Sequence, residues 1–159
     1  MRKRIIGQEV TAQGARPDET WLALEHIAEV EVTSEDAAFP IESALGPEST
    51  GKGWRAAEPG EQLVRIVFDA PTALHRIRLQ FVENQTARTQ EFVLRWAGKR
   101  SEARREIVRQ QWTFSPDGSI SEVEDYQVNL AAVAVLELAI KPDISGGTAL
   151  ASLMAWRVA

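Results

Sequence analysis

The chain of 159 residues contains no cysteine and only two histidines. Without cysteine there is no disulfide framework, no thiolate metal site and no cysteine nucleophile. Serine–histidine catalysis needs a histidine to accept the proton, and neither His26 nor His75 has a partner that the sequence makes evident. His75 lies in an alternating segment, where a structural role is favoured.

Long apolar runs and a surplus of basic residues are also missing. Arg2 to Arg4 are followed by only two apolar residues, so the sequence predicts neither a secretory signal nor a membrane span. The formal net charge is -5, which argues against binding to nucleic-acid phosphates. We therefore expect a cytoplasmic protein with neither nucleic-acid nor membrane partners.

Motifs of catalysis are absent too: there is no Walker loop, HExxH, GxSxG or GxGxxG. The glycine-containing segments 51–53 and 146–148 are interpreted as plain turns. Carboxylates cluster at 122–125, but a glycosidase needs two that face each other across a cleft, and such clusters are usually solvated surface. The sequence therefore predicts a protein that is not an enzyme.

What the sequence does contain is alternation of apolar and polar residues with period two, while helical periodicity is weak. This pattern predicts an all-β fold, an antiparallel two-sheet jelly-roll sandwich of about eight strands. The length suits a single domain over 21–159, preceded by an N-terminal arm over 1–20. The alternating segments are 28–33, 64–68, 75–81, 91–96, 108–114, 126–130, 134–140 and 150–158.

The apolar face of these segments predicts the core, which should include the following side chains: Ile77, Leu79, Phe81, Phe92, Leu94, Trp96, Leu136, Leu138 and Trp156. Trp112 is assigned to the core because it shares a face with Val108 and Phe114. Trp54 follows a glycine-containing loop, where packing at a strand entrance is favoured over a platform for stacking a sugar.

The functional prediction rests on the lengths of the connections between the expected strands. If consecutive strands are antiparallel, successive connections alternate between the two ends of the sandwich. The short turns 69–73, 98–105 and 131–132 then lie at one end. The long connections 46–62, 83–90, 115–125 and 141–148 lie at the other. Long loops gathered at one end of a rigid scaffold are typical of a binding module.

Several ordered motifs resemble the galactose-binding-like superfamily, in particular the discoidin (coagulation-factor type C) domains. The segments at 30–34 and 44–45 resemble the opening strand and its loop, and 53–56 followed by 62–69 resemble the family's tryptophan and next strand. Further similar segments lie at 71, 74–79 and 88–94, and the closing strands at 126–130, 136–138 and 151–158. The resemblance covers about 27–159.

The resemblance implies a non-catalytic module that binds carbohydrate through its loops. The alternative is an intracellular protein-interaction module of the same fold. Polar residues on the long connections suit a polyol or an anionic group, and the candidate ligand-binding set is Trp54, Arg55, Asn84, Arg88, Asp117 and Asp143. Arg88 either binds the ligand or only pairs with Glu83. No cofactor is predicted, although related sugar binders often carry structural calcium, and Glu122 to Asp125 offer oxygen ligands without calcium-loop spacing.

Overall fold

The computed structural model describes residues 20–46 and 51–159. The arm expected over 1–20 therefore lies almost entirely outside the described residues. Within these ranges the chain forms two short helices, neither of which is long enough to cross a membrane, and eight strands. In chain order the elements are α2 (Leu24–Ile27), β1 (Ala28–Val32), α3 (Glu42–Leu45), β2 (Trp54–Pro59), β3 (Gln62–Val82), β4 (Arg88–Ala97), β5 (Arg105–Phe114), β6 (Ser121–Lys141), β7 (Leu150–Leu153) and β8 (Ala155–Val158).

Two long strands, β3 and β6, organise the sandwich. Each has 21 residues, and they pair with each other in antiparallel fashion along both of their halves. The register shifts between Val67 and Arg76, which is where β3 bends. A strand that bends at such an irregularity can leave one layer and continue in the other.

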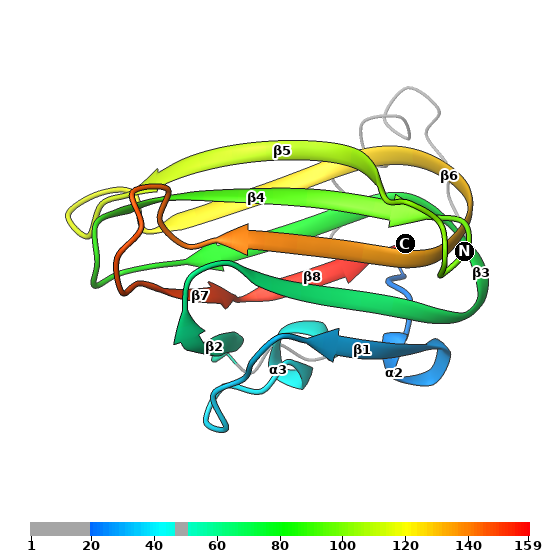
Figure 1. Ribbon diagram of the computed structural model, residues 1–159, viewed down its shortest axis with the longest axis horizontal. Coiled ribbons are helices and arrows are strands. Elements are labelled where there is room, and N and C mark those ends of the chain that lie inside the picture. The colour runs from blue at the N-terminus through cyan, green and yellow to red at the C-terminus, as the bar shows by residue number, and fades with distance from the viewer. Residues whose placement is uncertain (1–19, 47–50) are drawn as a thin grey trace, which may run out of the picture.

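The two halves of β3 and β6 therefore belong to two layers. The first half of β3 and the second half of β6 form one layer with β1, β4 and β5. The second half of β3 and the first half of β6 form the other layer with β8. In Figure 1 the two layers overlap, and β3 and β6 curve between them at the same end. A separate two-stranded sheet of β2 and β7 lies beside them.

The apolar face of each strand packs between the layers, as the alternation predicts. Ile77, Leu79 and Phe81 of β3 are fully buried, and the rings of Phe81 and Phe92 stack with centroids 5.2 Å apart. The other expected core residues are also buried, except Trp96 and Trp112, which are both half-buried. Trp96 is only half-buried, because it lies near the end of β4 with the guanidinium of Arg105 5.5 Å from its ring centroid.

The two ends of the sandwich differ, as the strand parity predicts. The bends of β3 and β6 and the turn 98–104 lie at one end, which we call the bend end. The connections 83–87, 115–120 and 142–149 lie at the other, which we call the loop end (Figure 1). Glu83 N–H donates to the Ile120 carbonyl at 2.8 Å and so joins two of these connections. Ile144 N–H of the third connection donates to the Thr89 carbonyl of β4 at 2.8 Å.

The strand boundaries differ from the sequence expectation in four places, one of which is the segment 150–158, expected as one strand but formed by β7 and β8 in different sheets. Two pairs of expected strands, 64–68 with 75–81 and 126–130 with 134–140, are each one continuous bent strand. The strand β2 lacks alternation in its sequence and was not expected. His75 points outward rather than sharing the core face of Ile77, because the register shift between Leu74 and Arg76 reverses the alternation there.

We expect Leu79→Ala to lower the free energy of unfolding by about 2–5 kcal/mol, because it removes a fully buried side chain from the core. Urea melts of the variant and the parent measure this difference. Val123→Ala is the matched control, since Val123 is 47% exposed and its loss should change stability by less than about 0.5 kcal/mol. Equal stability of Leu79→Ala and the parent would contradict the assigned face of β3.

Candidate functional site

A hollow of about 220 Å³ lies beside β2, where the end of β3 meets β7 and the connection that precedes β2. Its polar and aromatic lining comes from segments far apart in the sequence, namely Phe39, Lys52, Arg55, Asn84 and Ser152. We call it the Phe39–Arg55 hollow. None of the residues that line it is an Asp, Glu or His.

Arg55 and Phe39 hold each other at this hollow. The guanidinium carbon of Arg55 lies 4.1 Å from the centroid of the Phe39 ring, close enough for a cation–π contact. Their backbones are also joined, since Arg55 N–H donates to the Phe39 carbonyl at 3.1 Å. The Arg55 carbonyl in turn accepts from Asp36 N–H at 2.9 Å. The exposed guanidinium therefore has a defined position.

The loop that carries Phe39 is stabilised by two carboxylates. Asp36 accepts a hydrogen bond from Ala38 N–H at 2.9 Å, and Glu35 accepts one from Ile41 N–H at 2.7 Å. Side chains that bond to nearby backbone in this way are typical of fixed turns. The half-buried ring of Phe39 is thus presented by an ordered turn.

Trp54 forms the floor beneath this arrangement. Its side chain is fully buried, and its indole N–H donates to the Ser34 carbonyl at 3.2 Å. Gly53, immediately before it, has a φ of +67°, and a Cβ there would lie 2.5 Å from the carbonyl oxygen of Leu153. Only glycine fits so close to β7. The structure therefore places Trp54 in the core, in agreement with the packing interpretation and not as an exposed sugar platform.

Arg88, a candidate for direct ligand binding, is buried at the base of the loop end. Its side chain is 0% exposed, and its Nε donates to Glu83 at 2.9 Å. Its Nη1 donates to the Pro142 carbonyl at 2.7 Å and to Gln90 at 3.3 Å, and its guanidinium lies 4.9 Å from the Phe114 ring centroid. These acceptors hold the guanidinium below the surface of the loop end, where its Nη2 is buried without a partner among the described residues.

Asn84 is exposed on the turn that follows β3, and Glu83 shapes this turn. A carboxylate oxygen of Glu83 accepts from the N–H groups of Gln85 and Thr86 at 3.1 and 3.3 Å. Burial by itself raises the pKa of Glu83, but the hydrogen bond from Arg88 and those from the two N–H groups outweigh it, so the pKa is lowered. The ionised carboxylate therefore holds the turn from which Asn84 projects.

The remaining candidates do not join this hollow. Asp143 lines a second hollow of about 310 Å³ at the loop end, together with Glu61 and Lys141. Its carboxylate accepts from the hydroxyl and N–H of Ser145 at 2.7 and 3.0 Å, and these bonds lower its pKa. Asp117 is exposed on the turn 115–120 and lines neither hollow.

The structure therefore brings together three residues of the predicted set, since Trp54, Arg55 and Asn84 all line this hollow. Sequence reasoning missed Phe39, because it lies in a segment without strand periodicity that was not counted among the long connections. The available signal was an aromatic residue beside Pro40 in an otherwise polar loop. Lys52 was interpreted as part of a plain turn, yet it also lines the hollow.

The acidic segment 122–125 is not a solvated surface loop, because β6 already begins at Ser121. Glu122 is fully buried between the layers, where one of its oxygens accepts from Gln90 at 3.2 Å and the other has no partner among the described residues. Burial, together with the hydrogen bond and charge of Glu124, raises the pKa of Glu122 to about 8. Asp125 points the other way and pairs with Arg76 at 2.7 Å.

The inward direction of Glu122 corrects the expectation of a solvated cluster. The two carboxyl groups of Glu122 and Glu124 belong to the interior and not to either hollow at the loop end. Over residues 20–46 and 51–159, no group of three or more acidic, histidine or cysteine side chains is arranged to hold a metal ion.

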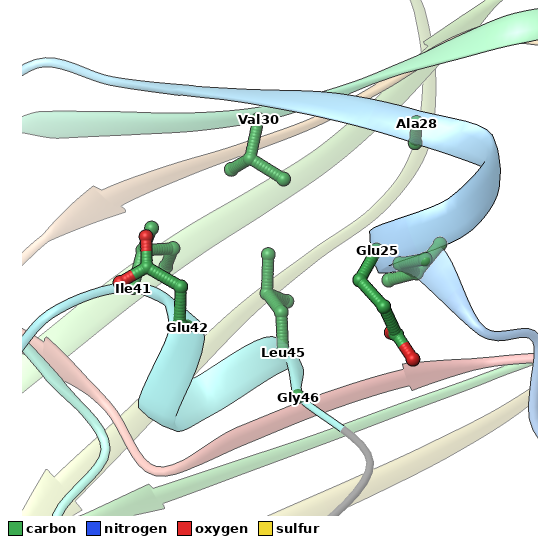
Figure 2. Close-up of a pocket in the computed structure, with 8 residues that line it drawn as sticks. Glu25, Ala28, Val30, Ile41, Glu42, Leu45 and Gly46 are labelled. Atoms are coloured by element: carbon green, nitrogen blue, oxygen red, sulfur yellow. The ribbon is translucent and has the colours of Figure 1, made fainter.

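A third hollow, of about 200 Å³, is apolar and lies between α2, β1 and α3. Figure 2 shows Leu45 pointing toward β1, with Glu25 and Glu42 on either side. The other lining side chains that the figure labels near it are Ala28, Val30 and Ile41. Nothing in the structure shows what covers this hollow, so it does not assign a function.

The fold is similar to that of family 32 carbohydrate-binding modules. The alignment with the module of Clostridium perfringens NanJ in complex with galactose covers 87% of this chain and 97% of that module, with a TM-score of 0.64 and 11% identity. CBM32-3 from a family 31 glycoside hydrolase of C. perfringens covers 92% and 96%, with a TM-score of 0.63 and 14% identity. The CBM32 of AlyQ in complex with 4,5-unsaturated mannuronic acid covers 84% and 95%, with a TM-score of 0.60 and 13% identity.

No family model and no curated protein matches the sequence. The structural likeness nevertheless confirms the predicted fold: the chain has the two-sheet β-sandwich fold of these modules. At these low identities the likeness establishes fold alone, and a shared fold does not by itself determine a ligand.

We expect Arg88→Met to lower the free energy of unfolding by about 3 kcal/mol, because it leaves the partly buried Glu83 carboxylate and the Pro142 carbonyl without their donor. Arg109→Met is the control, since Arg109 forms an exposed pair with Glu91 whose loss should cost less than about 1 kcal/mol. Urea melts measure both changes. If Arg88→Met has unchanged stability but no longer binds ligand, Arg88 is a ligand-binding residue and its structural role is contradicted.

We expect Glu122→Gln to remove a pH dependence of stability between about pH 4.5 and 8. In the folded state the raised pKa keeps Glu122 protonated, whereas in the unfolded chain the carboxyl group ionises near its ordinary pKa of 4.5. The parent therefore loses stability as the pH rises through this window, and Gln cannot ionise. In thermal melts, the melting temperature of Glu122→Gln relative to that of the parent should rise as the pH is raised across this window. Glu29→Gln, on an exposed position, is the control, and parallel curves for all three proteins would contradict the burial of a protonated Glu122.

Proposed function

We propose that the protein is a non-catalytic carbohydrate-binding module and that its ligand binds in the Phe39–Arg55 hollow. The observation that carries the proposal is an aromatic ring with directional polar groups beside it at the loop end. Aromatic side chains offer an apolar face to the C–H groups of a sugar, while arginine and asparagine side chains donate to its hydroxyl oxygens.

The position and size of the hollow support this function. Binding sites are commonly concave, with a few polar groups that converge on the ligand and determine its orientation. A volume of about 220 Å³ is below the roughly 300–1,000 Å³ typical of drug-sized ligands and suits one sugar unit of a longer chain. Sugar-bound structures among the similar folds point to the same ligand class.

The lining of the hollow also supports binding without catalysis. Hydrolysis of a glycosidic bond uses a pair of carboxyl groups, and no Asp or Glu lines the Phe39–Arg55 hollow. Glu122 and Glu124 do not supply such a pair to this hollow, because Glu122 is buried between the layers and neither residue lines the hollow. A protein-interaction module remains the alternative, for which a broad apolar surface would be needed. The expected cytoplasmic location stays a prediction.

A glycan array, followed by calorimetric titration of the oligosaccharides that bind, tests the proposal. We expect Phe39→Ala to weaken binding about tenfold, equivalent to about 1.4 kcal/mol, because it removes both the apolar face and the support of Arg55. Asn84→Ala should weaken it about threefold to tenfold through a lost hydrogen bond.

Asn129→Ala is the matched control, since Asn129 is an exposed asparagine on β6 outside this hollow. Its affinity should equal that of the parent. An array without any bound glycan would contradict the function. Binding that survives both hollow variants but is lost in Asp143→Asn would move the site to the second hollow.

A further inference from the structure

The guanidinium of Arg55 lacks a carboxylate partner among the described residues, although other arginines of the chain have one. Arg65, Arg88, Arg100 and Arg109 each lie within 2.8–3.0 Å of a glutamate oxygen. The Arg55 side chain instead contacts the Phe39 ring. An arginine carries five N–H donors in a planar fork, so most of these donors are available to a ligand.

The setting of Arg55 suits the recognition of a planar anion. The Phe39 ring lies against the guanidinium and leaves its edge for a partner. Both flanking backbone bonds hold β2 to the Phe39 loop, so little conformational freedom is lost when a ligand binds. A guanidinium fork and a carboxylate match in geometry and form two parallel N–H···O bonds.

The local charge of the hollow is opposite to that of the whole chain. The protein carries a formal net charge of -5, yet the charged residues that line the hollow are Lys52 and Arg55. Two described acidic residues on the adjoining loops are engaged elsewhere: Asp36 accepts from Ala38 N–H, and Glu83 pairs with Arg88. By contrast, the second hollow is lined by Glu61 and Asp143 as well as Lys141.

We infer that the ligand of the Phe39–Arg55 hollow is an acidic sugar, a uronic acid whose carboxylate is bound by the guanidinium of Arg55. This inference rests on the proposed carbohydrate-binding function and names its ligand class. Phe39 supports Arg55 and contacts the sugar ring, Arg55 takes the carboxylate, and Asn84 donates to a hydroxyl oxygen. Lys52 adds positive charge to the same hollow.

The test is a calorimetric comparison of matched acidic and neutral sugars. Trigalacturonate and trimannuronate are titrated beside their carboxyl-reduced counterparts, which keep the ring and the linkage but replace the carboxylate by a hydroxymethyl group. A sulfated galactose oligomer separates carboxylate recognition from attraction to any anion. We expect each uronate that binds to do so roughly ten- to a hundredfold more tightly than its reduced form, with an affinity that falls as salt is added.

Two substitutions at Arg55 examine the mechanism. Arg55→Gln should abolish the preference for the uronate while leaving the weaker affinity for the reduced sugar in place. Arg55→Lys keeps the charge but not the fork and should retain only part of the preference. The control is Arg105→Gln at the bend end, which removes the same charge from another exposed arginine that lies over an aromatic ring, here Trp96.

The outcomes separate the two proposals. Equal affinity for acidic and reduced sugars, with Arg55→Gln binding both as the parent does, would overturn the acidic ligand but leave a carbohydrate-binding module. Equal loss of uronate binding in Arg55→Gln and Arg105→Gln would reduce the preference to net charge and also overturn it. Preference for the sulfated oligomer over both uronates would overturn the carboxylate. Absence of binding to any sugar would overturn the proposed function as well.

Discussion

The rest of the structure depends on the antiparallel pairing of β3 with β6. Each strand is long enough to take part in both layers. Both strands bend at the same end of the sandwich, where their register shifts between Val67 and Arg76. Val64 faces Leu138 in one layer, whereas Leu79 faces Glu124 in the other. Because this single ladder runs through both layers, it sets their separation and the direction of every strand that pairs with either half.

The same pairing explains why the loop end is a suitable place for a binding site. Once β3 and β6 turn at the bend end, the connections after β3, β5 and β6 must leave from the opposite end. The buried Arg88 then joins them, because it donates to Glu83 on one connection and to the Pro142 carbonyl on another. A buried charged side chain needs acceptors for its donors, and Nε and Nη1 of Arg88 have them, whereas Nη2 is buried without a partner among the described residues. The exposed side chains therefore project from loops that are held at their base.

Several polar groups are buried inside the sandwich without hydrogen-bond partners among the described residues, which is energetically unfavourable. Glu122 lies between the layers with a carboxyl group that burial keeps protonated, and the indole N–H of Trp112 and the hydroxyl of Tyr126 are also buried without hydrogen-bond partners among the described residues. Desolvation, followed by the charges of Glu124 and Glu122, raises the pKa of Tyr126 as well.

The sequence by itself determined the fold class, the core face of most strands and the gathering of long connections at one end, because period-two alternation and strand parity are local properties. It could not determine which loop side chains meet. Phe39 and Arg55 come together only because β2 pairs with β7 and the Phe39 loop bonds to its backbone. Arg88 and Glu122 turn inward for a related reason: their environments depend on the register of distant strands and on hydrogen-bond partners more than 30 residues away, which no local pattern encodes.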